Sequence, residues 1–261
     1  MTKSKPFEHK GLIGAGLYGC VYKPPLKCID MPKLNKKYNK DIMKFAVDDP
    51  YANAEKYISS IIRDIDPKQE YFIPLSKDQC KVDIKREKKQ VDKCEKYKDD
   101  DTLNKDKYIG FFIRYGGIAL DKYIDLNGID LDNIFKFMLH TYKGLSILHK
   151  NNIVHRDLST SNIVISSDNI ARIIDFGQAT IVDKYNKYYK EDIYEDIKLL
   201  MEVFWDIRIE HGDEFEKKNK VLDENFIKLM DEIMDDSNVY KITIEYIMEY
   251  INKHIIPLIK K

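Results

Sequence analysis

Three polar side chains in the second half of the sequence have types and spacing suited to metal binding and proton transfer. Asp157 and Asn162 lie in the run His155-Arg156-Asp157-Leu158-Ser159-Thr160-Ser161-Asn162, and Asp175 follows in Ile173-Ile174-Asp175-Phe176-Gly177. Asn and Asp oxygens suit a hard cation such as Mg²⁺, and a further carboxylate can orient a hydroxyl and accept its proton. The β-like runs 163–165 and 171–174 would bring these side chains together if they pair. An unrelated loop with ordinary acids would not be expected to show this joint spacing.

A glycine cluster near the N-terminus offers a second chemical feature, Gly14-Ala15-Gly16-Leu17-Tyr18-Gly19-Cys20-Val21. Glycines let backbone N–H groups approach an anion without a Cβ in the way. This pattern either opens a helix in a dinucleotide-binding fold or forms the turn of a β-hairpin that covers phosphates. The β-like residues after Gly19 and the nearby Pro24 and Pro25 favour the hairpin. A purely structural glycine turn remains the alternative.

The elements that must position these residues change from strands to helices along the chain. The spacing of apolar residues predicts one helix over 51–65 in a region otherwise made of strands and loops. Glycines 116 and 117 end this region, and the chain beyond them is mainly helical. The predicted strands are two within 7–22, then 42–47, 71–75, 108–115, 163–165 and 171–174; the later helices are 131–149, 192–209, 224–234 and 243–256. Residues 81–107 are rich in both charges, which predicts a solvated surface insertion.

Composition excludes several classes of protein. The 44 basic and 44 acidic residues balance, and 43% of the 261 residues are hydrophobic. This predicts a folded chain with no global basic field for nucleic acid or membrane. The sequence has no stretch long and apolar enough for a membrane span, and its polar start lacks a signal-peptide pattern. The four cysteines are sparse and form no C-x-x-C pair, so we expect filler thiols in a reduced intracellular compartment.

The three motifs together resemble those of eukaryotic-type protein kinases. The glycine loop with its following Val21, the H-R-D-L-x-x-x-N pattern from His155 to Asn162 and the D-F-G triplet from Asp175 to Gly177 occur in the family's order. The resemblance implies a bilobal α+β fold, with a β-rich N-lobe over 1–115, a helical C-lobe over 116–261 and an ATP cleft between them. Backbone groups around 113–115 would then meet the adenine.

The resemblance also implies roles for individual residues. Asp157 would be the catalytic base, and Asn162 and Asp175 would hold Mg²⁺ against the phosphates of ATP. The implied partners are ATP and a protein whose serine or threonine hydroxyls accept the γ-phosphate. The loop that would cover the nucleotide consists of Ile13, Gly14, Ala15, Gly16, Leu17, Tyr18, Gly19, Cys20 and Val21.

The family also needs a strand lysine for the phosphates and a helix glutamate to hold it. Lys44 lies inside the apolar run 42–47, so we prefer it to Lys40 and Lys37, which lie in polar sequence. Glu55 is the acid that the helix 51–65 offers before Arg63. The alternatives are an edge-strand lysine that faces water and an exposed helix acid.

The sequence departs from the family's pattern at two places. Ser159 stands where serine/threonine kinases carry a lysine, which is similar to RIO-type kinases. No A-P-E motif follows Gly177, and the stretch from Asp175 to Asp192 or Asp196, the candidate starts of the next large helix, is short. Arg156 therefore risks lacking the phosphate that it pairs with in many kinases. The possible phosphorylation sites on tyrosine are Tyr185, Tyr188, Tyr189 and Tyr194.

Three functions fit these residues. The leading hypothesis is an ATP- and Mg²⁺-dependent kinase that phosphorylates serine or threonine on protein. The alternatives are a pseudokinase or RIO-like ATP-binding scaffold, motivated by Ser159, and a kinase acting on a small molecule, against which the H-R-D and D-F-G triplets speak. Lys, Ile, Tyr and Asn are common and Ala is scarce, which is typical of an AT-rich coding sequence. This bias and the segment Gly-Gly-Ile-Ala-Leu-Asp-Lys-Tyr-Ile are similar to those of kinases of large DNA viruses.

Overall fold

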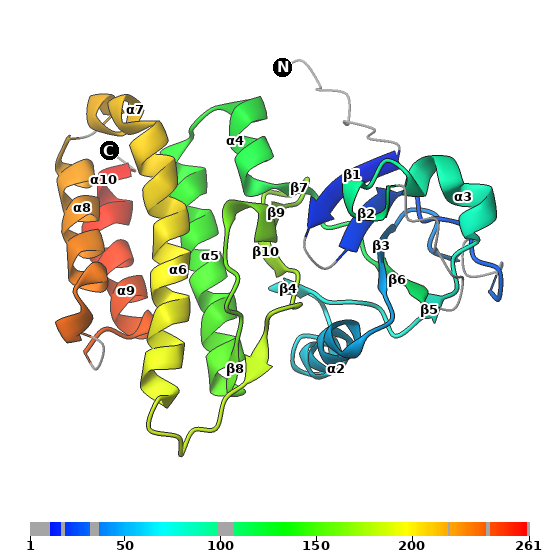
Figure 1. Ribbon diagram of the computed structural model, residues 1–261. Coiled ribbons are helices and arrows are strands. Elements are labelled where there is room, and N and C mark those ends of the chain that lie inside the picture. Colours follow the sequence, from blue (N-terminus) through cyan, green and yellow to red (C-terminus); the bar gives the residue numbers. More distant parts are fainter. Residues whose placement is uncertain are drawn as a thin grey trace. The chain divides into compact units, whose positions relative to one another are not determined.

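The computed structural model describes residues 11–16, 19–31, 37–98, 107–218, 220–238 and 241–259. The chain groups into two compact units, Met1–Ile61 with Pro74–Tyr115, and Ile62–Ile73 with Gly116–Lys261. The first unit is rich in strands and the second in helices, so the predicted α+β class is confirmed (Figure 1). The segment 62–73, which we predicted in the N-lobe, belongs to the second unit because its strand β4 (Phe72–Ile73) pairs with β10 (Ala171–Ile174) there.

The first unit is built on one antiparallel sheet with the order β1-β2-β3-β6-β5. The longer strands are runs of apolar residues, often β-branched or aromatic, that fit a pleated surface. Their bounds are Gly11–Gly16 (β1), Gly19–Lys23 (β2), Ile42–Val47 (β3), Tyr108–Ile113 (β6) and Gln79–Cys80 (β5). The structure also confirms the predicted helix, as α2 over Pro50–Ile65.

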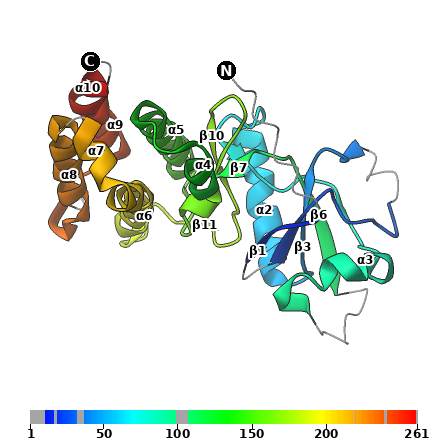
Figure 2. The ribbon, with the colours of Figure 1, turned by 90° about the horizontal axis from the view of Figure 1, so that it is seen from above.

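Each face of this sheet is buried against a different partner. Successive side chains of a strand point to opposite faces, so Ile109 and Phe111 of β6 pack with Ala52 of α2. Tyr108 and Phe112 point the other way and pack against the segment that follows β5. This segment contains α3 (Ile84–Val91) and the short 3-10 turn Glu95–Tyr97. Figure 2 shows α2 and α3 on different sides of the strands.

The prediction that residues 81–107 form a solvated insertion was wrong for the part of that run that the structure describes. Ile84, Val91 and Tyr97 are all buried and join the core cluster of Tyr22, Phe45 and Tyr108. Eight lysines and arginines between residues 81 and 98 conceal these few apolar positions in the composition. Burial of aromatic and aliphatic side chains supplies more stabilisation than a charged surface costs. The segment is therefore a cover on the sheet, and we call residues 81–98 the cover segment.

The prediction of free thiols was also wrong, because all four cysteines form disulfides. Cys20 of β2 is bonded to Cys94, and Cys28 is bonded to Cys80 at the end of β5. The fold of the cover segment brings these pairs together across 74 and 52 residues of sequence, respectively. Sequence spacing does not reveal such pairing. The inference of a reducing compartment therefore loses its basis.

The second unit begins with a small sheet of order β4-β10-β9-β7. β9 (Ile163–Ile165) and β10 pair as the antiparallel hairpin that the sequence predicted, and β7 (Ile118–Ala119) pairs with β9. Gly117, with φ +130°, lies so close to this sheet that a Cβ would stand 2.0 Å from the Ile165 carbonyl oxygen. The two glycines at 116 and 117 are thus required by packing.

Helices make up the rest of the second unit, and several of them pack side by side in Figure 1. The central pair is α5 and α6, which buries eight or more side chains from each helix. The helices are α4 (Leu120–Asn127), α5 (Leu131–Lys150), α6 (Tyr189–Glu210), α7 (Gly212–Lys218), α8 (Lys220–Met234), α9 (Ile244–Tyr250) and α10 (Ile256–Ile259), with a π-helical turn at Ile251–Ile255. In the described part of the chain, no helix has the length and apolar character to cross a membrane.

Candidate active site

The strand lysine and the helix glutamate meet inside the first unit. Lys44 Nζ lies 3.0 Å from Glu55 Oε1 and 2.8 Å from Oε2, so the ammonium group donates to both carboxylate oxygens. Both residues are 4% exposed. Lys44 points to the α2 side because its neighbours Met43 and Phe45 point toward the cover segment. A buried ion pair is stable only when both charges are compensated, so the amine is held in one place.

The glycine cluster forms a hairpin and not the start of a helix. β1 and β2 pair antiparallel, with Gly16 opposite Gly19 and Gly14 opposite Val21. The register of the pairing shifts in β1 between Leu12 and Gly14. At Gly19, with φ +158°, a Cβ would stand 2.5 Å from the Phe45 carbonyl oxygen. Ala15 and Cys20 face one another in the same hairpin. Leu17 and Tyr18, also predicted to contact the nucleotide, lie outside the described residues.

In the second unit, Asp157 and Asn162 are joined directly. The Asn162 amide nitrogen donates to the backbone carbonyl of Asp157 at 2.8 Å and to Asp157 Oδ2 at 3.0 Å. The 3-10 turn Thr160–Asn162 shortens the path between the two residues. These two bonds use the amide nitrogen of Asn162, and its carbonyl oxygen is the atom of that side chain that can bind a cation.

A buried histidine connects this loop to the strand that leads into Asp175. The N–H of Asp157 donates to His155 Nδ1 at 3.3 Å, so the ring proton lies on Nε2, which is 3.1 Å from the Ile174 carbonyl. His155 is fully buried and meets Phe176 edge to face, with 5.1 Å between ring centroids. The loop from His155 to Asn162, which we call the catalytic loop for the role that its motif implies, is therefore fixed to the D-F-G triplet through this imidazole.

Asp175 has an unusual backbone conformation. Its φ is +59°, in the left-handed region that side chains other than glycine adopt at a cost. The next residue, Phe176, is 1% exposed and packs against Phe72 of β4. Burial of Phe176 on one side and the β10 strand on the other holds Asp175 in this conformation, with Oδ1 accepting the N–H of Gly177 at 3.3 Å.

Asp196 in α6 holds the backbone of the catalytic loop. Its Oδ2 accepts the N–H of His155 at 2.6 Å, and its Oδ1 accepts the N–H of Arg156 at 2.7 Å. Burial alone would raise the pKa of this carboxyl, but the hydrogen bond from His149 at 3.2 Å, the charge of His149 and the N–H of Arg156 together lower it. The sequence left Asp192 and Asp196 open as the buried start of this helix, and the buried one is Asp196, 1% exposed.

Asp192 has a different place. Arg156 Nη2 lies 2.7 Å from Asp192 Oδ1, and the two side chains are 48% and 30% exposed. Arg156, whose φ is +62°, directly precedes Asp157. The expectation that this arginine would lack a phosphate partner stays a prediction, and the same helix supplies a carboxylate to it one turn before Asp196.

The short segment after Gly177 is tied to the catalytic loop by a two-stranded pairing. β11 (Thr180–Ile181) pairs antiparallel with β8 (Ile153–Val154). Among the tyrosines proposed for phosphorylation, Tyr185 and Tyr188 are 84% and 56% exposed. Tyr194 is buried and its hydroxyl donates to the Ile233 carbonyl, so its inclusion among the possible sites was wrong.

The donor set of the second unit fits Mg²⁺ bound together with a phosphate. Asn162, with its amide oxygen, directly precedes β9, and the carboxylate Asp175 directly follows β10, so the antiparallel pairing of Ile163 with Ile173 puts both at the same end of the hairpin. Mg²⁺ is commonly held by one or two protein oxygens, with substrate phosphates and water completing its shell. Among the described residues, no group of three or more His, Cys, Asp and Glu side chains forms a metal centre by itself.

Known proteins share this part of the chain. Residues 100–197 match the family described as "Protein kinase domain". A probable serine/threonine-protein kinase MRK1 homolog of Encephalitozoon cuniculi is 31% identical over 83 residues, covering 31% of this chain and 26% of that protein. Serine/threonine-protein kinase STY46 of Arabidopsis thaliana is 36% identical over 67 residues, 25% of this chain and 12% of that protein. Serine/threonine-protein kinase PLK4 of Nematostella vectensis is 53% identical over 45 residues, which cover 17% of this chain and 5% of that protein.

Over residues 100–197 the chain is therefore similar to protein kinases, in agreement with the motifs of the sequence. The matched residues contain the catalytic loop, the D-F-G triplet and Asp196. The chain spans about a quarter of the length of the first of these relatives and an eighth of the second.

Proposed function

We propose that this chain is a protein kinase that transfers the γ-phosphate of ATP, with Mg²⁺, to serine or threonine hydroxyls of a protein. The observation that carries the proposal is the contact between Asp157 and Asn162, whose amide nitrogen binds Asp157 Oδ2 at 3.0 Å. A carboxylate thus lies beside an amide group whose oxygen would bind the cation in the proposed function. The similarity to named serine/threonine kinases supports the choice of acceptor.

Each of these residues has a separate role in the proposed mechanism. Asp157 accepts the hydrogen bond of the acceptor hydroxyl and then its proton as the oxygen attacks the γ-phosphorus. The bond from the γ-phosphorus to the bridging β-phosphate oxygen breaks, and ADP leaves. Lys44, held by Glu55, binds the α- and β-phosphate oxygens, and the backbone of the hairpin from Gly14 to Gly19 covers the phosphates. Asn162 and Asp175 would hold Mg²⁺, and the bound ion would neutralise phosphate charge. Positioning and charge compensation account for most of the catalysis.

Incubation with ATP labelled on the γ-phosphorus tests the proposal. We expect label to enter the chain or a generic basic protein only when Mg²⁺ is added, and acid hydrolysis should release labelled phosphoserine or phosphothreonine. Absence of transfer by folded protein to every acceptor tried, or label found only as phosphotyrosine, would contradict the proposal.

A second candidate is an ATP-binding scaffold with little or no transfer activity. Ser159, where kinases of the proposed class carry a lysine, bonds through its hydroxyl to the Ser161 hydroxyl at 2.9 Å. A neutral pair of hydroxyls therefore stands at this position in place of a cation for the γ-phosphate. A rise in melting temperature with Mg²⁺ and ATP, without transfer of label, would favour this function.

A further inference from the structure

The residue that directly follows the last glycine of the hairpin forms a disulfide. Cys20 follows Gly19, the last glycine of the turn, and its sulfur is bonded to Cys94 in the cover segment. A one-residue step along a strand is about 3.3 Å, so the covalent link lies next to the backbone that covers phosphates in the proposed function. Cys20 and Cys94 are both fully buried.

The surroundings of this bond are closely packed. Cys20 lies opposite Phe45 in the sheet, and Phe45 meets Tyr97 of the cover segment edge to face, with 5.1 Å between centroids. The Gly19 Cα is so near the Phe45 carbonyl that no side chain fits there. Gly19 is thus fixed by its close contact with β3 and by the covalent bond of the next residue, Cys20.

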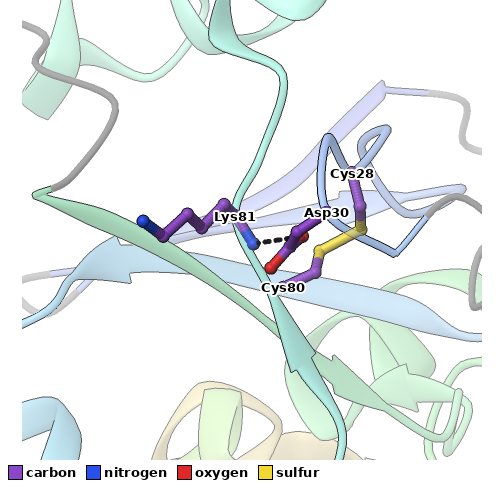
Figure 3. Close-up of a disulfide and its surroundings, with 4 residues drawn as sticks. All are labelled: Cys28, Asp30, Cys80 and Lys81. Atoms are coloured by element: carbon purple, nitrogen blue, oxygen red, sulfur yellow. Dashed lines mark hydrogen bonds between the residues drawn. A yellow bond between two sulfur atoms is a disulfide. The ribbon is translucent and has the colours of Figure 1, made fainter.

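The second disulfide, Cys28–Cys80, holds the cover segment at a different place (Figure 3). Asp30 Oδ1 accepts the N–H of Lys81 at 2.9 Å, and the N–H of Ile29 donates to the Lys81 carbonyl at 2.9 Å. Hydrogen bonds therefore already fix the chain beside this bond. It lies farther along the chain from the glycine turn than Cys20 does, which makes it a matched control.

We propose that the Cys20–Cys94 disulfide is a positioning element that fixes the exit of the glycine turn, so that the affinity for ATP depends on it. The inference rests on the proposed function, because it assigns this turn to the phosphates. A backbone whose exit at Gly19 and Cys20 is fixed loses less conformational freedom when the nucleotide binds. Because both sulfurs are buried, a thiol reductant has poor access to the bond in the folded protein. The bond is therefore a lasting constraint on the turn.

Two single substitutions, Cys94→Ala and Cys80→Ala, separate this role from general stabilisation. Each removes one disulfide, and the entropic effect of a disulfide changes only with the logarithm of loop length. Loops of 74 and 52 residues therefore give similar losses of stability. We expect Cys94→Ala to raise the KM for ATP by about tenfold with kcat changed less than about twofold, and Cys80→Ala to leave both within about twofold. The KM for the protein acceptor should stay the same in both variants.

A second comparison needs no substitution. Wild-type protein refolded in excess dithiol, with its four thiols confirmed by alkylation, is compared with the oxidised protein for equilibrium ATP binding. We expect about tenfold weaker binding by the reduced form.

The outcomes distinguish this inference from the function on which it rests. If oxidised wild-type protein binds no ATP, the proposed function fails. If it binds ATP, and the Cys94→Ala variant and the reduced protein bind equally well, the positioning role is wrong while the function stands. Four free thiols in untreated wild-type protein, or an equal rise in KM from Cys80→Ala, would also overturn the inference.

Discussion

Lys44 Nζ contacts both carboxylate oxygens of Glu55, at 3.0 and 2.8 Å, and neither residue is more than 4% exposed. The pair joins the middle strand of the sheet in the first unit to helix α2. Because each charge compensates the other away from water, changing either one has consequences for both stability and phosphate binding.

Removal of Glu55 should therefore destabilise the chain more than removal of a surface acid. We expect Glu55→Gln to lower the free energy of unfolding by about 3 to 5 kcal/mol, the usual result of leaving a buried charge without its partner. Asp132→Asn breaks an exposed pair with Lys136 and should cost about 1 kcal/mol or less. Urea denaturation measures both, and equal losses would show that the buried pair is not structurally important.

Lys44→Met should reduce transfer from ATP on the order of 10²-fold, because it removes a fixed cation from the phosphates. Lys37→Met, at one of the lysines that we rejected, is the matched control and should keep wild-type activity. Steady-state kinetics with varied ATP make the comparison. Loss of activity in the control alone would transfer the phosphate-binding role to Lys37.

The ion pair between Arg156 and Asp192 predicts activity without phosphorylation of the following segment. Asp192→Asn should lower kcat by about tenfold or more, since Arg156 precedes Asp157, the proposed catalytic base, and small misplacements of such a group are costly. Glu195→Gln, on the same helix but 65% exposed, should have no effect. The Tyr185→Phe and Tyr188→Phe variants should also stay active. A requirement for either tyrosine hydroxyl would contradict the prediction.

His140 gives the chain a predictable response to acid. Its half-buried ring stacks on Tyr71 with 4.7 Å between centroids. Burial lowers the pKa of His140, and this effect outweighs the rise caused by the hydrogen bond to the Glu70 carbonyl and by the Glu70 charge. The folded form therefore binds a proton less readily than the unfolded form. Stability should be complete above the unfolded pKa of about 6.5 and should fall as the pH drops below it.

Denaturation curves at pH 7 and pH 5 test this response. The His140→Gln variant should lose less stability between these two pH values than the wild type does. The His254→Gln variant, which changes an exposed ring, should keep the wild-type pH dependence. An unchanged pH dependence in His140→Gln would exclude His140 as the source.

The sequence predicted the elements whose apolar pattern is strong. The runs 42–47, 163–165 and 171–174 are strands with those bounds, and the helix 51–65 begins only one residue earlier. Local pattern decides these elements because their side chains are buried on one or both faces. The motif spacing likewise predicted that Asp157 and Asn162 would be neighbours.

Contacts between distant segments decided the rest. Helix α3 has only Ile84 and Val91 as buried residues among charges, so it lacks the periodicity that predicts a helix. The same absence of pattern hid the cover segment and both disulfides. Asp192 and Asp196 occupy the same face of one helix, and only the position of the catalytic loop determines which of them accepts its backbone N–H groups.

The central claim is that Asp157 is the catalytic base of phosphate transfer, and the Asp157→Asn variant tests this claim most directly. Asparagine keeps the size of the side chain but cannot accept a proton, whereas Asp183→Asn changes an exposed acid outside the catalytic loop. With ATP labelled on the γ-phosphorus, we expect transfer to fall by about 10²-fold or more in Asp157→Asn and to stay at the wild-type level in Asp183→Asn. Equal transfer by the wild type and Asp157→Asn would contradict the account.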